Sequence, residues 1–193
     1  DRGAFVRAGN FNGGAITAED GITYQADDDN NNDGTAWLGS YKYVDGQFGD
    51  TVSPITNVEG PMEAEIYKTA RYGGKATDFS YTISQLEANT QYVLTLKFAE
   101  IWYLHSTPGK RVFDVLVNNA LVIDNLDLMA RAGMHIAFDK DVLGTSDANG
   151  VIKITMPVTA DNAQIAAIAL HKAPEPADQG PTAVMTHDVP DSA

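Results

Sequence analysis

The feature that most constrains this chain is a two-residue alternation of apolar and polar side chains. The segment 92–98 reads Tyr-Val-Leu-Thr-Leu-Lys-Phe, and its even-numbered positions are all large and apolar or aromatic. Successive side chains of a β-strand point to opposite faces, so these four share one face, whereas Thr95 and Lys97 point to the other. The pattern predicts a strand that buries one face and leaves the other in water.

The same alternation recurs along the chain. It is clear in 111–118, where Phe113, Val115 and Val117 point inward and Asp114 outward, and in 151–158; the small apolar run 165–172 is typical of a central strand. A hairpin is expected where Asn118 and Asn119 join two runs, because Asn tolerates positive φ. No long segment has helical periodicity, so the chain is predicted to be an all-β sandwich or barrel. The shorter predicted strands are 4–8, 21–25, 64–71, 79–83 and 120–124.

Length, charge and composition narrow the function. The 193 residues make about one domain, and the formal net charge of -13 disfavours nucleic acid and anionic membranes as partners. The chain has no cysteine, which excludes disulfides, zinc thiolate sites and cysteine nucleophiles and favours a bacterial exported protein. Residues 1–172 are expected to form the domain, and the segment 173–193, rich in proline and acidic residues, a linker to an attached domain.

Catalytic motifs are weak in this sequence. Two carboxylates suffice for glycoside hydrolysis, and Glu65, Glu100, Asp114 and Asp127 are candidates without specificity. Glu100 ends an apolar strand, and the ordinary alternative is that it accepts hydrogen bonds from the loop backbone or a nearby arginine. The four histidines, His105, His135, His171 and His187, are not paired at metal-ligand spacing and are expected to be structural or exposed.

One loop has the composition of a calcium site. Asp29, Asn31 and Asp33, followed by Gly34, match the first half of an oxygen-ligand calcium loop, but Ser40 stands where the bidentate glutamate belongs. The loop is therefore either a solvated turn or a calcium site of another geometry. No cofactor is required, and calcium is a possible ligand.

Aromatic residues gather at strand ends. Trp102 and Tyr103 follow a strand, Tyr72 ends another candidate strand, and an early loop carries three more rings. Sugars have flat C–H faces that pack on rings, and carboxylates, amides or guanidinium groups bind their hydroxyls, so these positions suit a glycan site; the alternative is that the rings cover the edge of the sandwich. The rings of the early loop are Trp37, Tyr41 and Tyr43.

Three segments, in order and spacing, resemble the malectin-like family. Its "L-Y-x-T-x-R-Y", "Y-x-V-x-L-x-F-A-E-x-Y-F" and "x-R-V-F-D-V-x-V-N-G" segments correspond here to IYKTARY (66–72), YVLTLKFAEIWY (92–103) and KRVFDVLVN (110–118). The resemblance spans about residues 4–172, with Trp102 and Tyr103 in place of the family's Tyr-Phe pair. It implies a galactose-binding-like jelly roll that binds carbohydrate without chemistry, and bacterial relatives of the family are modules attached to glycosidases.

The resemblance also implies a binding site and a setting. By motif position, Tyr72, Trp102, Tyr103 and Asp161 correspond to ligand-binding residues, and Trp37 or Tyr43 supplies a further ring. We therefore expect a secreted or cell-surface bacterial module, monomeric, that targets a linked glycoside-degrading domain to an oligo- or polysaccharide. Two other readings stay open: a protein-interaction or spacer domain of the same fold, and a catalytic domain acting on polysaccharide.

Overall fold

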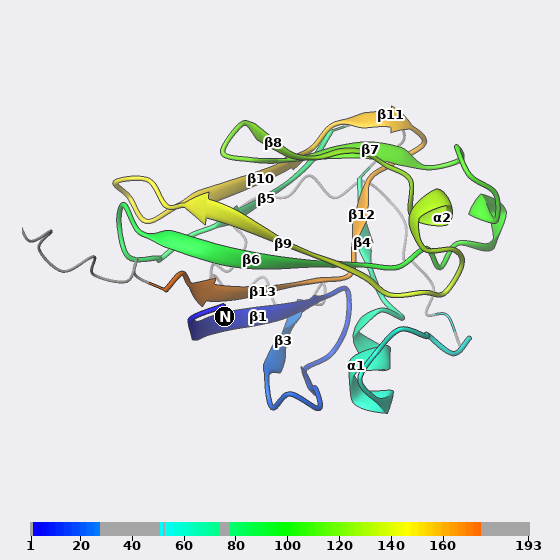
Figure 1. The fold of residues 1–193 in the computed structure, drawn as a ribbon, viewed down its shortest axis with the longest axis horizontal. Helices are drawn as coiled ribbons and strands as arrows, with labels where there is room; N and C mark the ends of the chain where they lie inside the picture. The colour runs from blue at the N-terminus through cyan, green and yellow to red at the C-terminus, as the bar shows by residue number, and fades with distance from the viewer. Residues whose placement is uncertain (1, 28–50, 52, 74–77, 175–193) are drawn as a thin grey trace, which may run out of the picture.

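Two β-sheets packed face to face make up the chain in a computed structural model that describes residues 2–27, 51, 53–73 and 78–174 (Figure 1). The larger sheet has the strand order β2-β3-β1-β13-β6-β9, with β13 at its centre. Its strands are β1 (Ala4–Phe11), β2 (Ile16–Thr17), β3 (Thr23–Asp27), β6 (Gln91–Phe98), β9 (Phe138–Thr145) and β13 (Ala167–Lys172).

The second sheet has the order β11-β7-β10-β5, and β8 pairs with β7. Its strands are β5 (Phe79–Ile83), β7 (Val112–Val117), β8 (Ala120–Leu126), β10 (Ile152–Met156) and β11 (Val158–Ala160). A two-stranded sheet of β4 (Arg71–Tyr72) and β12 (Gln164–Ile165) runs between the two layers near one end of the sandwich (Figure 1). The predicted all-β jelly-roll sandwich is confirmed.

The main core lies between the two sheets, where the alternation places it. The inward residues of β6, including Leu94 and Leu96, meet Phe113 and Val115 of β7 and are fully buried. Two asparagines with positive φ, Asn118 and Asn119, form the predicted turn between β7 and β8. Large apolar side chains thus fill the space between the layers, as hydrophobic burial favours.

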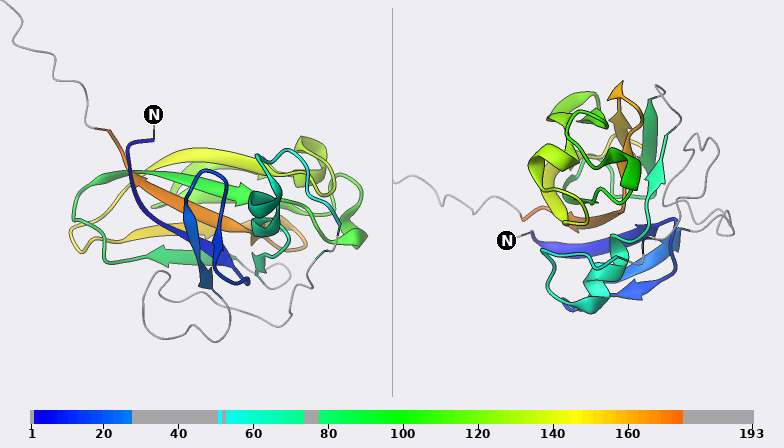
Figure 2. Two further views of the ribbon diagram at one scale, coloured as in Figure 1. Left: turned by 90° about the horizontal axis from the view of Figure 1, so that it is seen from below. Right: turned by 90° about the vertical axis from the view of Figure 1, so that its right-hand side faces the viewer.

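The prediction that β6 is wet on one face is wrong. Thr95 is 0% exposed and Lys97 is 4% exposed, because a second core covers the outer face of the larger sheet. The small side chains of Ala8, Ala167 and Ala169 on that face leave room for other chain segments to approach closely. Figure 2 shows the cyan helix on the outside of this sheet, beside the blue N-terminal strands that form one edge of the sheet itself.

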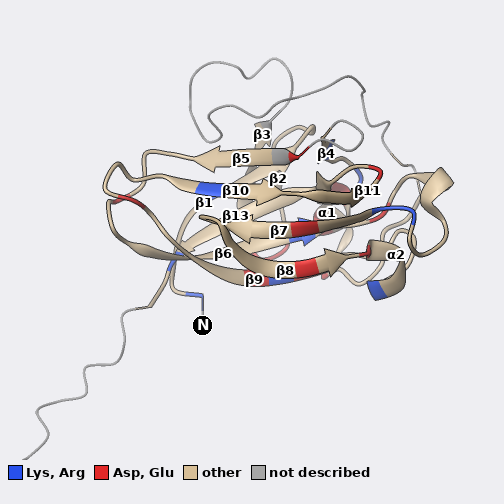
Figure 3. Ribbon diagram, turned by 90° about the horizontal axis from the view of Figure 1, so that it is seen from above, with Lys and Arg blue, Asp and Glu red and all other residues tan. Residues whose placement is uncertain are grey.

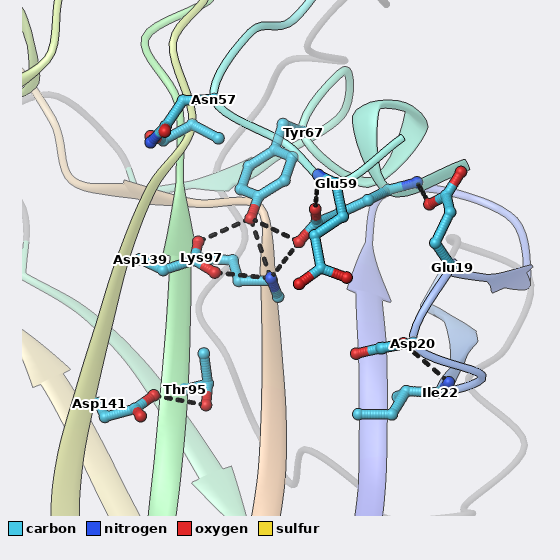
Figure 4. A network of polar contacts seen from close by, with 12 residues as sticks. Glu19, Asp20, Ile22, Asn57, Glu59, Tyr67, Thr95, Lys97, Asp139 and Asp141 are labelled. Atoms are coloured by element: carbon cyan, nitrogen blue, oxygen red, sulfur yellow. Dashed lines mark hydrogen bonds and ion pairs between the residues drawn. The ribbon is translucent and has the colours of Figure 1, made fainter. Parts of the chain in front are cut away.

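Lys97 is buried with Tyr67, and its two carboxylate partners, Glu63 and Asp139, lie partly exposed at the edge of this second core (Figure 4). Its ammonium donates to Glu63 Oε1 at 2.9 Å, to the Tyr67 hydroxyl at 2.9 Å and to Asp139 Oδ2 at 2.6 Å. Burial alone would lower the pKa of Lys97, but the neighbouring Tyr67 and Asp139 outweigh burial and raise it. All three ammonium protons have acceptors, so the Lys97 charge can be buried even though the alternating pattern predicts it to be exposed to solvent.

The predicted strand 64–71 is also wrong, because most of it is helix or turn. Helix α1 (Pro61–Ile66) begins with a proline at its first turn, and β4 contributes only two residues. The Glu19 carboxylate accepts hydrogen bonds from the backbone N–H groups of Met62 and Glu63, both at 2.8 Å. A residue more than 40 positions upstream thus satisfies the free donors of the first helical turn.

Two further short helical elements lie on either side of the β7–β8 hairpin in the sequence, one before β7 and one after β8. They are the 3-10 turn η1 (Tyr103–His105) and helix α2 (Leu128–Arg131). No helix in the described part of the chain is long and apolar enough to span a membrane.

Candidate functional site

The candidate site begins at the end of β6, where the chain turns out of the larger sheet. The rings of Trp102 and Tyr103 lie 5.1 Å apart between centroids and are tilted by 45°. Trp102 is half-buried against the second core, whereas the Tyr103 side chain is 69% exposed at the start of η1. One ring anchors the turn and the other faces solvent, which is an arrangement that can offer a stacking surface.

A buried ion pair holds this turn from below. Glu100 and Arg111 are joined at 2.8 Å between Oε2 and Nε, and both side chains are 1% exposed. The other carboxylate oxygen of Glu100 accepts the backbone N–H of Trp102 at 3.0 Å. Glu100 therefore has the ordinary role considered from the sequence, since both its oxygens accept hydrogen bonds from a nearby arginine and the loop backbone.

The small sheet places Tyr72 near the same turn. Tyr72 pairs with Gln164 across β4 and β12, and the Gly73 N–H donates to the Ala163 carbonyl at 3.0 Å. The Gln164 amide in turn donates to the carbonyl of Ala99, the residue before Glu100, at 2.9 Å. Strand β12 thus links Tyr72 to the end of β6.

Asp161 precedes β12 and has a left-handed φ of +58°, which aspartate adopts more readily than most residues. Its carboxylate Oδ2 lies 3.0 Å from His105 Nε2, and the side chain is 26% exposed. The neighbouring Asn162 accepts hydrogen bonds from Arg111 through its carbonyl at 3.1 Å and through its side-chain oxygen. Arg111 therefore contacts both the aromatic turn and the segment that carries Asp161.

The structure thus connects the segments that carry Trp102, Tyr103 and Asp161 through the contacts of Arg111. Tyr72 is connected to the end of β6 separately, through β12. The other candidates, Trp37, Tyr43, Asp29, Asn31 and Asp33, lie outside the described residues, so these predictions stay predictions. Within the residues that the structure describes, no group of three His, Cys, Asp or Glu side chains could hold a metal ion.

Sequence reasoning did not assign a role at the site to His105, Arg111 or Asn162. Arg111 could have been found, because it opens the R-V-F-D-V segment and an arginine before a buried strand needs a partner. His105 and Asn162 have no comparable signal, since their roles depend on contacts across more than 50 positions of sequence, between Arg111 and Asn162, and between His105 and Asp161.

The strand order and the packing of the two sheets define an all-β sandwich domain. The family model of the malectin domain matches residues 5–174. The chain therefore belongs to the malectin domain family and carries a malectin-type carbohydrate-binding domain.

Similar proteins agree with this assignment. Malectin-A of Xenopus laevis is 38% identical over 80 residues, which are 42% of this chain and 27% of that protein. Human malectin is 35% identical over 80 residues, 42% of this chain and 26% of that protein. The matched stretch thus spans about a quarter of the length of these relatives.

Solved structures share the fold. The extracellular domain of ANXUR1 from Arabidopsis thaliana has a TM-score of 0.70 and 20% identity, over 88% of this chain and 48% of that chain. The β-glucuronidase of Bacteroides uniformis has a TM-score of 0.66 and 19% identity, over 87% of this chain and 18% of that chain.

Proposed function

We propose that this domain binds an oligo- or polysaccharide through Tyr72, Trp102, Tyr103 and Asp161 and catalyses no reaction. The observation that carries the proposal is the Trp102–Tyr103 turn, whose exposed Tyr103 ring is 69% accessible beside a buried scaffold. Rings of this kind pack on the C–H face of a sugar, and the Asp161 carboxylate is an acceptor for sugar hydroxyls. A small and wet site of this type gives affinities in the micromolar to millimolar range.

The proposal extends to the setting of the domain. We expect a secreted or cell-surface protein in which residues 173–193 link the module to a glycoside-degrading domain. The likeness to part of a bacterial β-glucuronidase, matched over 18% of that chain, supports the idea of a module within a larger enzyme. The bacterial origin inferred from the missing cysteines stays a prediction.

The test is a set of native affinity gels cast with α-glucan, β-glucan, galactan or mannan. The wild-type domain should be retarded by at least one of them, and Tyr103→Ala should weaken binding about tenfold or more, because the exposed ring that packs on the sugar is lost. Leu121→Ala is the matched control, since Leu121 is an exposed apolar residue of β8, 55% accessible and on the other sheet.

Other outcomes separate the alternatives. Release of sugar products in solution assays with the same polysaccharides would identify a catalytic domain. Absence of binding to all four glycans, together with specific capture of a neighbouring domain, would favour an interaction module. Repeating the gels with a chelator tests whether Asp29, Asn31 and Asp33 form a calcium site that binding needs.

A further inference from the structure

Three hydrogen bonds and one close ion-pair contact join the two halves of the candidate site. The Trp102 N–H donates to Glu100, Glu100 accepts from Arg111, Arg111 Nη2 lies 2.8 Å from His105 Nδ1, and His105 Nε2 lies 3.0 Å from Asp161 Oδ2. His105 is 9% exposed, so its partners are these groups rather than bulk water. Asp161 and the aromatic turn are therefore linked through one imidazole ring.

The neighbours of His105 determine its tautomer. Arginine has only donors, so the His105 Nδ1 that faces Arg111 must be an unprotonated acceptor. The proton of a neutral ring then sits on Nε2, the nitrogen that lies 3.0 Å from Oδ2 of the Asp161 carboxylate. Burial lowers the pKa of His105 and Arg111 lowers it further, against the opposing effect of Glu100 and Asp161 and with a smaller lowering effect of Lys110.

We propose that His105 is the positioning residue of the glycan-binding aspartate: its neutral Nε2–H form fixes Asp161 against the Arg111 scaffold, and protonation of the ring displaces the carboxylate and weakens glycan binding. This proposal rests on the proposed function. His105 itself need not touch the sugar, because it acts through Asp161.

Protonation changes the contacts in a defined way. An imidazolium has a proton on both nitrogens, so Nδ1 would face the Arg111 guanidinium as a donor against a donor and as a cation against a cation. The Glu100 Oε1 atom, 3.9 Å from Nδ1, is the acceptor within reach of a ring that turns away. That oxygen already accepts from the Trp102 N–H, so the turned ring competes for the contact that fixes the aromatic turn. Asp161 stays paired with Nε2 and moves with the ring.

Replacing His105 by glutamine separates the effect of protonation at this position from the effect of positioning Asp161. Its side-chain amide provides an acceptor for Arg111 and a donor for Asp161, and it cannot gain a proton in the physiological range. His105→Gln should therefore have an affinity for glycan that does not change on acidification, because position 105 no longer gains a proton. His105→Leu removes the hydrogen bond with Arg111 and the contact with Asp161, and should bind about tenfold more weakly at neutral pH, since a hydrogen bond to a charged group is lost.

The first measurement needs no sugar. Long-range ¹H–¹⁵N spectra of the histidine rings in the full chain should show His105 neutral, with the proton on Nε2, at about pH 7. In Asp161→Asn the charge that favours the imidazolium is gone, so His105 should titrate at lower pH than in the wild type. An imidazolium or a proton on Nδ1 at neutral pH, or a titration that ignores Asp161→Asn, would overturn the proposal.

The second measurement repeats the four glycan gels at about pH 7.5 and about pH 5, where most carboxylates stay charged. Wild type should bind more weakly at the lower pH, because a fraction of His105 gains its proton, whereas His105→Gln should bind equally at both. His171→Gln is the matched control, because His171 also has a pKa lowered by burial but lies at the far end of β13, and it should keep the wild-type pH profile. Equal acid sensitivity in wild type and His105→Gln would overturn the proposal.

The two measurements separate this proposal from the proposed function. If no gel retards the wild type while the spectra show the expected tautomer and the Asp161→Asn shift, the glycan function fails and the pairing of His105 with Asp161 stands. If glycan binds but the pH profile of His105→Gln matches that of wild type, the function stands and the positioning role fails.

Discussion

At the scale of single residues, the site depends on charges that are buried in pairs. Arg111 is 2% exposed, and its guanidinium contacts Glu100, His105 and Asn162. A buried ion pair adds little net stability compared with an apolar pair, but removing one partner leaves the other charge without compensation. Arg111 therefore matters for stability and for the position of the aromatic turn at the same time.

Arg111→Met should lower the free energy of unfolding by about 3 to 5 kcal/mol, because the Glu100 carboxylate loses its counter-ion while buried. Urea denaturation measures the loss. Lys172→Met is the control: its ion pair with Glu87 has side chains that are 41% and 65% exposed, so its loss should change stability by less than about 1 kcal/mol. A loss below about 1 kcal/mol for Arg111→Met would contradict the buried-pair account.

The two buried histidines give the fold a pH dependence. Burial lowers the pKa of His105 and of His171 below the ordinary value of 6.5. The unfolded chain then binds more protons than the folded one, so these residues stabilise the fold fully above about pH 6.5, and that contribution is lost as the pH falls toward their folded pKa. Thermal melts between about pH 7.5 and about pH 5 should show a falling Tm, with a shallower fall in His105→Gln.

At the scale of elements, the sequence predicted the strands better than it predicted which segments pack on their outer faces. Strands β7 and β10 follow the alternation because one face is buried in the core and the residues of the other face are exposed or only partly buried. Strand β6 breaks this rule because Lys97 is covered by residues from other elements: Glu63 of α1, Tyr67 directly after α1, and Asp139 of β9. Two-residue periodicity within β6 carries no information about these distant segments.

The errors of element assignment have the same origin. Residues 64–71 alternate well enough for a strand, but Pro61 and the distant Glu19 carboxylate start a helix there. Strand β9 was not predicted because Asp139 and Asp141 interrupt its apolar pattern, and their partners Lys97 and Thr95 lie across the sheet. For the site, the sequence indicated the aromatics and Asp161 through family resemblance, whereas the His105 contact needed coordinates.

The turns between elements allow a matched pair of glycine variants. Gly150 and Gly21 both have positive φ, +71° and +81°, but a Cβ at Gly150 would lie 2.0 Å from the Leu86 carbonyl oxygen, whereas nothing lies within 4 Å of one at Gly21. Gly21→Ala should cost about 1 kcal/mol, from backbone conformation. Gly150→Ala should cost clearly more, about 3 kcal/mol, because the loop between β5 and β6 must also shift. Equal losses in urea denaturation would show that the backbone at Gly150 relaxes freely.

At the scale of the whole molecule, acidic residues outnumber basic residues by 26 to 13. The net charge is -13, and acidic positions lie on the adjoining strands β7 and β8 (Figure 3). Such a field repels polyanions and leaves neutral sugars unaffected, in keeping with a site built from rings and one carboxylate. Binding of a neutral glycan should therefore change less than about twofold between low and high salt, since no counter-ions are released; a steep salt dependence in the gels would point to a charged ligand.

The proposed boundary between the folded domain, residues 1–172, and the linker, residues 173–193, can be tested by shortening the chain. Strand β13 lies at the centre of the larger sheet and ends at Lys172, and the Ala173 N–H still donates to the Gln91 carbonyl at 2.9 Å. A chain shortened after Pro174 should thus keep every described contact and melt within about 2 °C of the full chain, with unchanged glycan binding. A chain that ends before Ala167 loses the central strand, along with the buried Ile168 and Leu170, and should not fold. If removal of residues 175–193 lowered the Tm by more than about 5 °C, that segment would belong to the folded domain and would not be a linker.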